Sequence, residues 1–230
     1  MKTLSIIIPT YNEAATIDTI LTRVFAVHLS GWQKQVIVVD DGSADNTRRI
    51  LASWQKKVTV ISTPHNQGKG AAVRYGLTRA TGEIILIQDA DLEYSPEDYP
   101  ALLRPFDNPS ISVVYGSRFL GPHLTGQFIY ALGNKFVTFL SNILFNSNIS
   151  DMETGYKLFR QEVIVPLRIQ AKRFDFEPEI TAKVLRSGHR IYEVPVSYYG
   201  RSFAEGKKIT WRDGLIAVWT LFKYRFTSLP

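Results

Sequence analysis

Residues 84–91 read Ile-Ile-Leu-Ile-Gln-Asp-Ala-Asp, an apolar run followed almost at once by two carboxylates. A short apolar run of this kind predicts a strand buried on both faces, as in a parallel sheet covered by helices. Side chains two positions apart in an extended segment point the same way, so Asp89 and Asp91 should face one spot at the carboxyl end of this strand. Ligands of open α/β sheets bind at that edge. The pair therefore suits a divalent cation that also contacts a diphosphate, and the simplest alternative is a solvated acidic turn.

Similar apolar runs recur through the first half of the chain. They predict four further strands, at residues 4–8, 36–39, 58–61 and 111–115, the last ended by Gly116. Helical spacing between the runs predicts helices over residues 14–27, from Ser43 or Asp45 to about Trp54, over 68–80, and from Pro96 onward. The alternation predicts an α/β fold with a mostly parallel, doubly wound sheet flanked by helices.

The second half is less regular. It offers a long apolar stretch interrupted by polar pairs, a helix, an edge strand that tolerates Pro195, a glycine-containing charged loop and a basic, aromatic helix, at residues 128–145, 178–187, 190–199, 200–208 and 210–226 respectively. We expect one domain over residues 1–209 and an appended amphipathic helix over 210–230. That helix would lie on a membrane surface or pack its apolar side on the core. The 128–145 stretch is a second candidate for membrane or dimer contact.

Composition excludes several classes of function. The chain has no cysteine, which removes disulfides, thiolate catalysis and cysteine-based zinc sites. Its four histidines are far apart, and no nucleophile elbow is present. Neither a signal peptide nor a membrane-spanning segment is expected. Residues 1–115 carry 11 Lys and Arg against 12 Asp and Glu, and residues 116–230 carry 16 against 9. This basic second half suits a phosphorylated substrate or an anionic membrane, whereas no motif supports nucleic-acid binding.

Two loops should reach the same sheet edge as Asp89 and Asp91. Tyr11 follows the first strand and can stack on a base, and Asp40 or Asp41 follows the second and can accept from a base or a ribose. Residues 66–70, Asn-Gln-Gly-Lys-Gly, suit an anion at a helix start but lack the Walker A spacing. The chain also lacks G-x-G-x-x-G, which counts against a dinucleotide oxidoreductase. Together these residues predict a nucleotide site with metal and electrostatic chemistry.

Three motifs in this order resemble the family 2 glycosyltransferases of the GT-A fold: IIPTYNE at residues 7–13, VDDGS at 39–43 and DAD at 89–91. Further segments resemble the polyprenyl-phosphate hexosyltransferases, which include dolichyl-phosphate mannose synthases and dolichyl-phosphate glucosyltransferases. These segments are GSR at 116–118, DMETGYKLF at 151–159 and EVPV at 193–196. The resemblance covers about residues 4–215, and its motifs are specific for the fold and reaction but weak for the sugar.

The resemblance implies a role for each matching residue. Asp89 and Asp91, helped by Glu93, would hold Mg²⁺ or Mn²⁺ against the donor diphosphate. The nucleotide-sugar site as a whole would comprise Pro9, Tyr11, Glu13, Asp40, Asp41, Lys69, Asp89, Ala90, Asp91, Arg201 and Lys207. The last two lie on a glycine-containing loop that resembles a lid. Arg118 and Lys135 would meet the acceptor phosphate, and Asp91, Arg118 and Asp151 would form the catalytic set.

The implied reaction is inverting transfer of a hexose, from GDP-mannose or UDP-glucose, to a polyprenyl phosphate. A phosphate monoester is already anionic near neutral pH and needs cations rather than a general base. Asp151 would then orient the acceptor or the basic residues. The alternative is a glycan or small-molecule hydroxyl acceptor, for which Asp151 or Glu153 would be the base. A lipid acceptor places the protein at the cytoplasmic face of a membrane, bound peripherally or through a separate membrane-anchoring partner.

Overall fold

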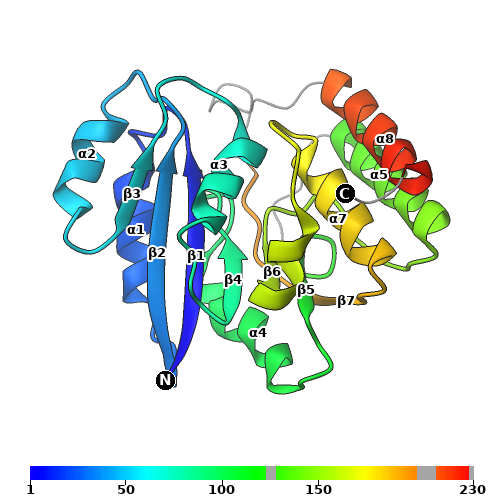
Figure 1. Cartoon of the computed structure of the whole chain (residues 1–230), viewed down its shortest axis with the longest axis horizontal. Coiled ribbons are helices and arrows are strands. Elements are labelled where there is room, and N and C mark those ends of the chain that lie inside the picture. Colours follow the sequence, from blue (N-terminus) through cyan, green and yellow to red (C-terminus); the bar gives the residue numbers. More distant parts are fainter. Residues whose placement is uncertain (123–127, 201–210, 228–230) are drawn as a thin grey trace.

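The computed structural model describes residues 1–122, 128–200 and 211–227. Its centre is a seven-stranded sheet in the order β3-β2-β1-β4-β6-β5-β7 (Figure 1). The strands are β1 (Lys2–Thr10), β2 (Trp32–Asp40), β3 (Thr59–Ser62), β4 (Ile84–Ile87), β5 (Val113–Ser117), β6 (Lys157–Arg160) and β7 (Ile191–Pro195). All neighbouring pairs are parallel except those of β6, which runs antiparallel to both β4 and β5.

Helices cover both faces of this sheet (Figure 1). Alternate residues of β1 divide between the faces, because Ile6 and Ile8 lie in one buried cluster and Ile7 in the other. The helical segments are α1 (Ile17–Ala26), α2 (Thr47–Trp54), α3 (Lys69–Leu77), η1 (Pro96–Asp98), α4 (Tyr99–Leu103), η2 (Arg104–Asp107), α5 (Phe128–Phe145), α6 (Gln161–Ile164), η3 (Val165–Leu167), α7 (Phe176–Arg186) and α8 (Trp211–Phe226). The predicted mostly parallel α/β architecture is therefore confirmed.

Two expectations about the strands were wrong. Gly116 does not end β5 but lies inside it, because the strand pairing with β7 continues through Gly116 and Val194. A Cβ on Gly116 would come within 2.7 Å of Val196 and 2.9 Å of Tyr156. The glycine allows close packing of neighbouring segments rather than a turn. The second error is β6, which the sequence did not reveal as a strand. It is only four residues long and is paired on both sides, so its position depends on β4 and β5.

Residues 128–145 form one continuous helix in spite of the polar pairs within the stretch. This helix, α5, lies beside α8 on the right of Figure 1. Val137 of α5 lies in one buried cluster with Ala217, Leu221 and Tyr224 of α8. The same cluster contains Met152. The expected C-terminal helix therefore exists, and one side of it is buried. The predicted boundary at residues 209 and 210 lies outside the described residues. In the part of the chain that the structure describes, no helix has the length and apolar character needed to span a bilayer.

Candidate active site

The loops after β1, β2, β4 and β5, which carry many of the predicted residues, lie at the carboxyl ends of these strands. Thr10 at the end of β1 is paired with Asp40 at the end of β2, and Gln88 after β4 donates its N–H to Ile7 of β1. Register therefore brings the loops that follow β1, β2 and β4 to one edge. Arg118 follows β5, which ends at the same edge because β6 is antiparallel to both β4 and β5, so β5 runs in the same direction as β4.

Asp40 and Asp41 are both buried and have different partners. Asp40 accepts from the Ser43 N–H at 3.1 Å and from Arg48 Nε at 2.7 Å. Asp41 accepts from the N–H groups of Gln67 and Gly68, and Gly68 donates at 2.6 Å. Asp41 thus fixes the loop that leads into α3, and Asp40 fixes its own loop to Arg48.

The loop after β1 is tied to the loop after β2. Asn12 donates its N–H to Ser43 Oγ at 2.9 Å, and Glu13 donates its N–H to Thr47 Oγ1 at 3.0 Å. Ser43 is therefore a cross-loop acceptor, and Asp45 accepts the Thr47 N–H at the start of α2. Pro9 near the end of β1, and Tyr11 and Glu13 in this loop, are partly buried. These hydrogen bonds hold the two loops in a fixed arrangement relative to one another.

Asp89, Ala90, Asp91 and Glu93 follow β4 at the centre of the edge. Asp89 is bound through both oxygens by Lys69 Nζ, at 2.8 and 3.1 Å, and its Oδ2 also lies against Gly155, where a Cβ would be 2.3 Å away. The backbone N–H of Glu93 donates to Asp91 at 3.2 Å.

This donor set fits a hard divalent cation. Mg²⁺ typically takes one or two carboxylates and completes its shell with substrate phosphate and water, and Asp89 and Asp91 supply such oxygens. The described residues contain no ready group of three acidic or histidine ligands, so part of the shell would come from a bound diphosphate and water. Asp89 already binds one positive charge, the Lys69 ammonium, which is consistent with a cationic ligand there.

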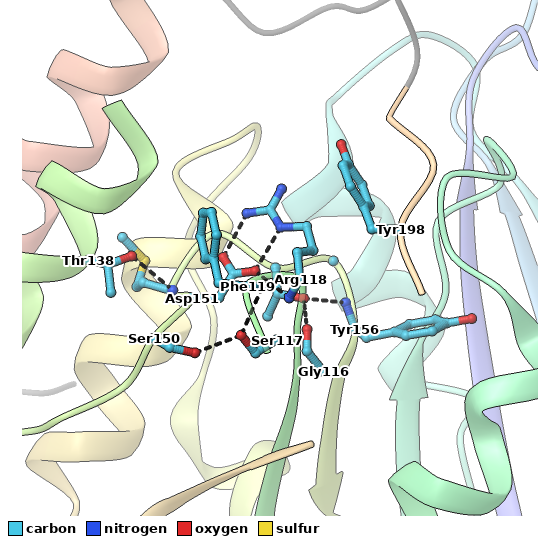
Figure 2. Close-up of polar contacts among 12 residues, drawn as sticks. Gly116, Ser117, Arg118, Phe119, Thr138, Ser150, Asp151, Tyr156 and Tyr198 are labelled. Carbon is cyan, nitrogen blue, oxygen red and sulfur yellow. Dashed lines mark hydrogen bonds and ion pairs between the residues drawn. The ribbon is translucent and has the colours of Figure 1, made fainter. Parts of the chain in front are cut away.

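Arg118 and Asp151 form a buried, bidentate ion pair (Figure 2). Arg118 Nε and Nη2 each lie 2.7 Å from the two oxygens of Asp151, and the Arg118 backbone N–H donates to the same carboxylate at 3.0 Å. The Asp151 side chain is 0% exposed and that of Arg118 is 12% exposed. Burial opposes the positive charge of Arg118, but Asp151 outweighs it, so the guanidinium pKa lies well above its usual value.

Aromatic rings flank this cation. The guanidinium carbon of Arg118 lies 5.2 Å from the Tyr198 ring centroid and 5.9 Å from that of Phe119, and both rings are visible beside it in Figure 2. Lys135 Nζ on α5 lies 5.6 Å from the Phe119 ring, so both predicted acceptor-phosphate cations contact one aromatic side chain. Cation–π contacts hold cations without neutralising their charge. The third guanidinium nitrogen of Arg118, Nη1, takes no part in the ion pair with Asp151.

Three carboxylates near the site were missed or only partly anticipated. Glu193 on β7 accepts from the N–H and Oγ of Ser150 and from the N–H of Asp151, and so anchors the loop that carries Asp151. Glu177 at the start of α7 binds Lys69 at 2.8 Å. The pKa of buried Glu153 is raised to about 7, first by burial and then by the charge of Glu177. Glu193 lies in the EVPV segment and Glu153 in the DMETGYKLF segment, so both had a signal in the sequence, whereas Glu177 had none.

Arg201 and Lys207, the two cations expected on a lid-like loop, lie outside the described residues.

Residues 5–166 match the family Glycosyl transferase family 2. Three relatives are similar to this chain over most of its length. The chain spans only 58% to 69% of the length of those relatives. Dolichol-phosphate mannosyltransferase of Pyrococcus furiosus is 30% identical over 209 residues, which are 88% of this chain and 58% of that protein. Dodecaprenyl-phosphate galacturonate synthase of Rhizobium johnstonii is 25% identical, over 99% of this chain and 69% of that protein. A dolichyl-phosphate beta-glucosyltransferase of Trichomonas vaginalis is 26% identical, over 85% and 65%.

A solved structure supports the fold independently. Glucosyl-3-phosphoglycerate synthase from Mycobacterium tuberculosis, in complex with Mn²⁺, uridine diphosphate and glucosyl-3-phosphoglycerate, superposes with a TM-score of 0.76 at 20% identity, covering 97% of this chain and 80% of that one. This likeness confirms the predicted GT-A fold. With the family motifs at the sheet edge and a family match over residues 5–166, the chain belongs to glycosyl transferase family 2.

Proposed function

We propose that this protein is an inverting, metal-dependent transferase that moves a hexose from GDP-mannose or UDP-glucose to a polyprenyl phosphate. The observation that carries the proposal is the buried Arg118–Asp151 pair at the edge that also holds Asp89 and Asp91. The three relatives are named for transfer to dolichol phosphate, dodecaprenyl phosphate and dolichyl phosphate, which supports the same class of acceptor here.

In this proposal the loops after β1 and β2 bind the nucleoside, with Pro9, Tyr11, Glu13 and Asp40 toward the base and ribose. Asp41 supports them by shaping the loop that precedes Lys69. Lys69, Ala90, Arg201 and Lys207 complete the donor site. Asp89, Asp91 and Glu93 hold Mg²⁺ or Mn²⁺, which when bound neutralises the charge that develops on the departing nucleoside diphosphate.

Arg118 and Lys135 bind the acceptor phosphate, which attacks the anomeric carbon. The hydrogen bonds that Asp151 already accepts favour a phosphate over a hydroxyl group as the sugar acceptor. Both of its oxygens accept hydrogen bonds from Arg118, and the side chain is fully buried. A general base must reach the proton that it removes, and Asp151 would first have to release Arg118. A phosphate nucleophile avoids that step, because it needs only to be held by cations.

We further propose that the face formed by α5 and α8 binds an anionic membrane surface, which would bring the enzyme to its acceptor. Exposed apolar side chains recur at helical spacing on both helices: Leu132, Phe136, Phe139 and Ile143 on α5, and Leu215, Ile216, Trp219, Phe222 and Phe226 on α8. Arg212, Lys223 and Arg225 of α8 are also exposed. An apolar face with flanking cations suits the interface of an anionic bilayer. We place it at the cytoplasmic face, bound peripherally or beside a membrane-anchoring partner.

Sugar transfer into the lipid phase tests the proposed reaction. Labelled GDP-mannose and UDP-glucose are offered separately with Mg²⁺ or Mn²⁺, with and without a polyprenyl phosphate. We expect label in the lipid phase only when acceptor and metal are both present, and the active donor names the sugar. Label on a soluble hydroxyl acceptor, abolished by Asp151→Asn, would instead support the alternative with Asp151 as base. Nucleotide binding without turnover on any acceptor would contradict both reactions.

A further inference from the structure

Lys69 joins two carboxylates that are far apart in the sequence. Its ammonium lies 2.8 Å from Asp89 Oδ1 and 2.8 Å from Glu177 Oε1, which brings together the start of α3, the end of β4 and the start of α7. The three side chains are 16%, 20% and 7% exposed respectively, so water screens the bridge only weakly. The two carboxylates compensate the charge of the buried Lys69 ammonium.

The backbone beneath Lys69 cannot move easily. A Cβ on Gly68 would come within 2.3 Å of the Lys172 carbonyl oxygen, and a Cβ on Gly70 within 2.5 Å of the Ala171 carbonyl oxygen. The N–H of Ala71 also donates to the Lys172 carbonyl. The start of α3 thus packs closely against residues 171–172, and rotation of the lysine side chain would displace the ammonium without moving this backbone.

We propose that the Lys69 ammonium is the resident counter-ion of Asp89, and that it leaves Asp89 for the donor diphosphate when a divalent cation binds, so that cation and nucleotide bind cooperatively. The inference rests on the proposed function. A divalent cation and the ammonium compete for the same carboxylate and repel one another. Displacement by the cation alone leaves Lys69 with Glu177 only, whereas a bound diphosphate gives it a second anionic partner.

Glu177 is the positioning residue in this arrangement. It shares the ammonium with Asp89 at an equal distance, so it weakens the hold of Lys69 on Asp89 and keeps the displaced ammonium near the site. Its second oxygen, Oε2, is buried without a hydrogen-bond partner in the described parts of the chain. Among the described residues Lys69 forms the ion pair with Glu177, whose charge also acts on Lys157.

The test is the coupling between Mn²⁺ and nucleotide, measured without turnover. Mn²⁺ binding is titrated by electron paramagnetic resonance, alone and with saturating GDP or UDP, for the wild-type protein, Lys69→Met and the control Lys172→Met. Coupling free energies between sites are typically about 1–3 kcal/mol, which is about 5- to 150-fold in affinity. We expect a wild-type factor in that range, a smaller factor for Lys69→Met together with tighter binding of Mn²⁺ alone, and the wild-type factor for Lys172→Met, since direct contact between cation and diphosphate keeps part of the coupling in every variant.

An unchanged coupling factor in Lys69→Met would overturn the inference and leave the proposed function intact. A wild-type protein that binds neither Mn²⁺ nor GDP nor UDP would overturn both. Glu177→Gln provides a second test should Lys69→Met fail to fold, as judged by circular dichroism. Without the Glu177 charge, Lys69 forms an ion pair with Asp89 only. Mn²⁺ in the absence of nucleotide should therefore bind more weakly. Equal or tighter Mn²⁺ binding in Glu177→Gln would refute the proposed displacement.

Discussion

Asp151→Asn removes the charge from one side of a buried ion pair while preserving the shape of the side chain. The Asp151 carboxylate is 0% exposed and accepts three hydrogen bonds from Arg118, two from the guanidinium and one from the backbone. An asparagine offers one oxygen and presents an amide donor to the other guanidinium nitrogen. The variant therefore leaves a cation buried without its counter-charge.

Breaking a buried pair in this way costs about 3–5 kcal/mol of the free energy of unfolding. For a chain of this length each kcal/mol lowers Tm by about 2–4 °C, so we expect a fall of roughly 6–20 °C. Glu97→Gln is the matched control, because Arg23 and Glu97 also form an ion pair at 2.6 Å but with side chains 34% and 58% exposed. Its loss should cost about 0–1 kcal/mol.

The assays are urea unfolding, for the free energy, and thermal unfolding, for Tm, each followed by tryptophan fluorescence and circular dichroism. A double variant, Arg118→Met with Asp151→Leu, completes the comparison. It removes both charges, so it should be more stable than Asp151→Asn alone by at least about 1 kcal/mol, although the Arg118 backbone N–H loses its acceptor. A loss below about 1 kcal/mol for Asp151→Asn would refute the reasoning, because that is the behaviour of an exposed pair. A double variant no more stable than Asp151→Asn would refute it equally.

Four other changes test the remaining parts of the site. Asp91→Ala should abolish metal-dependent binding of the donor while leaving the circular dichroism spectrum unchanged, and normal turnover would contradict the assigned metal site. Arg118→Ala should raise KM for the polyprenyl phosphate by at least about tenfold, as for the loss of about 1.4 kcal/mol of binding, with little change for the nucleotide sugar; equal effects on both would place it elsewhere. The Glu153 pKa is about 7 in the folded protein against an ordinary 4.5, so its contribution to stability is present below pH 4.5 and is lost as the pH rises through 7. Glu153→Gln should remove that part of the pH slope of the urea midpoint, and parallel slopes for the two proteins would count against a raised pKa. Trp219→Glu should reduce sedimentation with anionic vesicles severalfold, whereas Val165→Glu, also at an exposed apolar residue but outside the α5–α8 face, should not.

Much of the fold followed from local sequence pattern. The apolar run 84–87 coincides with β4, because four buried residues bounded by polar ones fix both the type and the ends of a strand. The location of Asp89 and Asp91 followed too, since the carboxyl ends of parallel strands share one edge. The edge position of the strand that ends at Pro195 could also be predicted, because proline lacks the N–H that a central strand needs.

Only the tertiary structure decided which side chains meet. Arg118 and Asp151 pair across 33 positions, and Lys69 meets Glu177 from a different helix. The four residues of β6 become a strand because β4 and β5 offer hydrogen-bonding edges on both sides. Gly116 lies within a strand because β7 pairs with it, and the close packing of Val196 and Tyr156 leaves no room for a Cβ there. Local pattern specifies elements and their ends, but long-range packing specifies charge partners, since those depend on where separate elements come into contact.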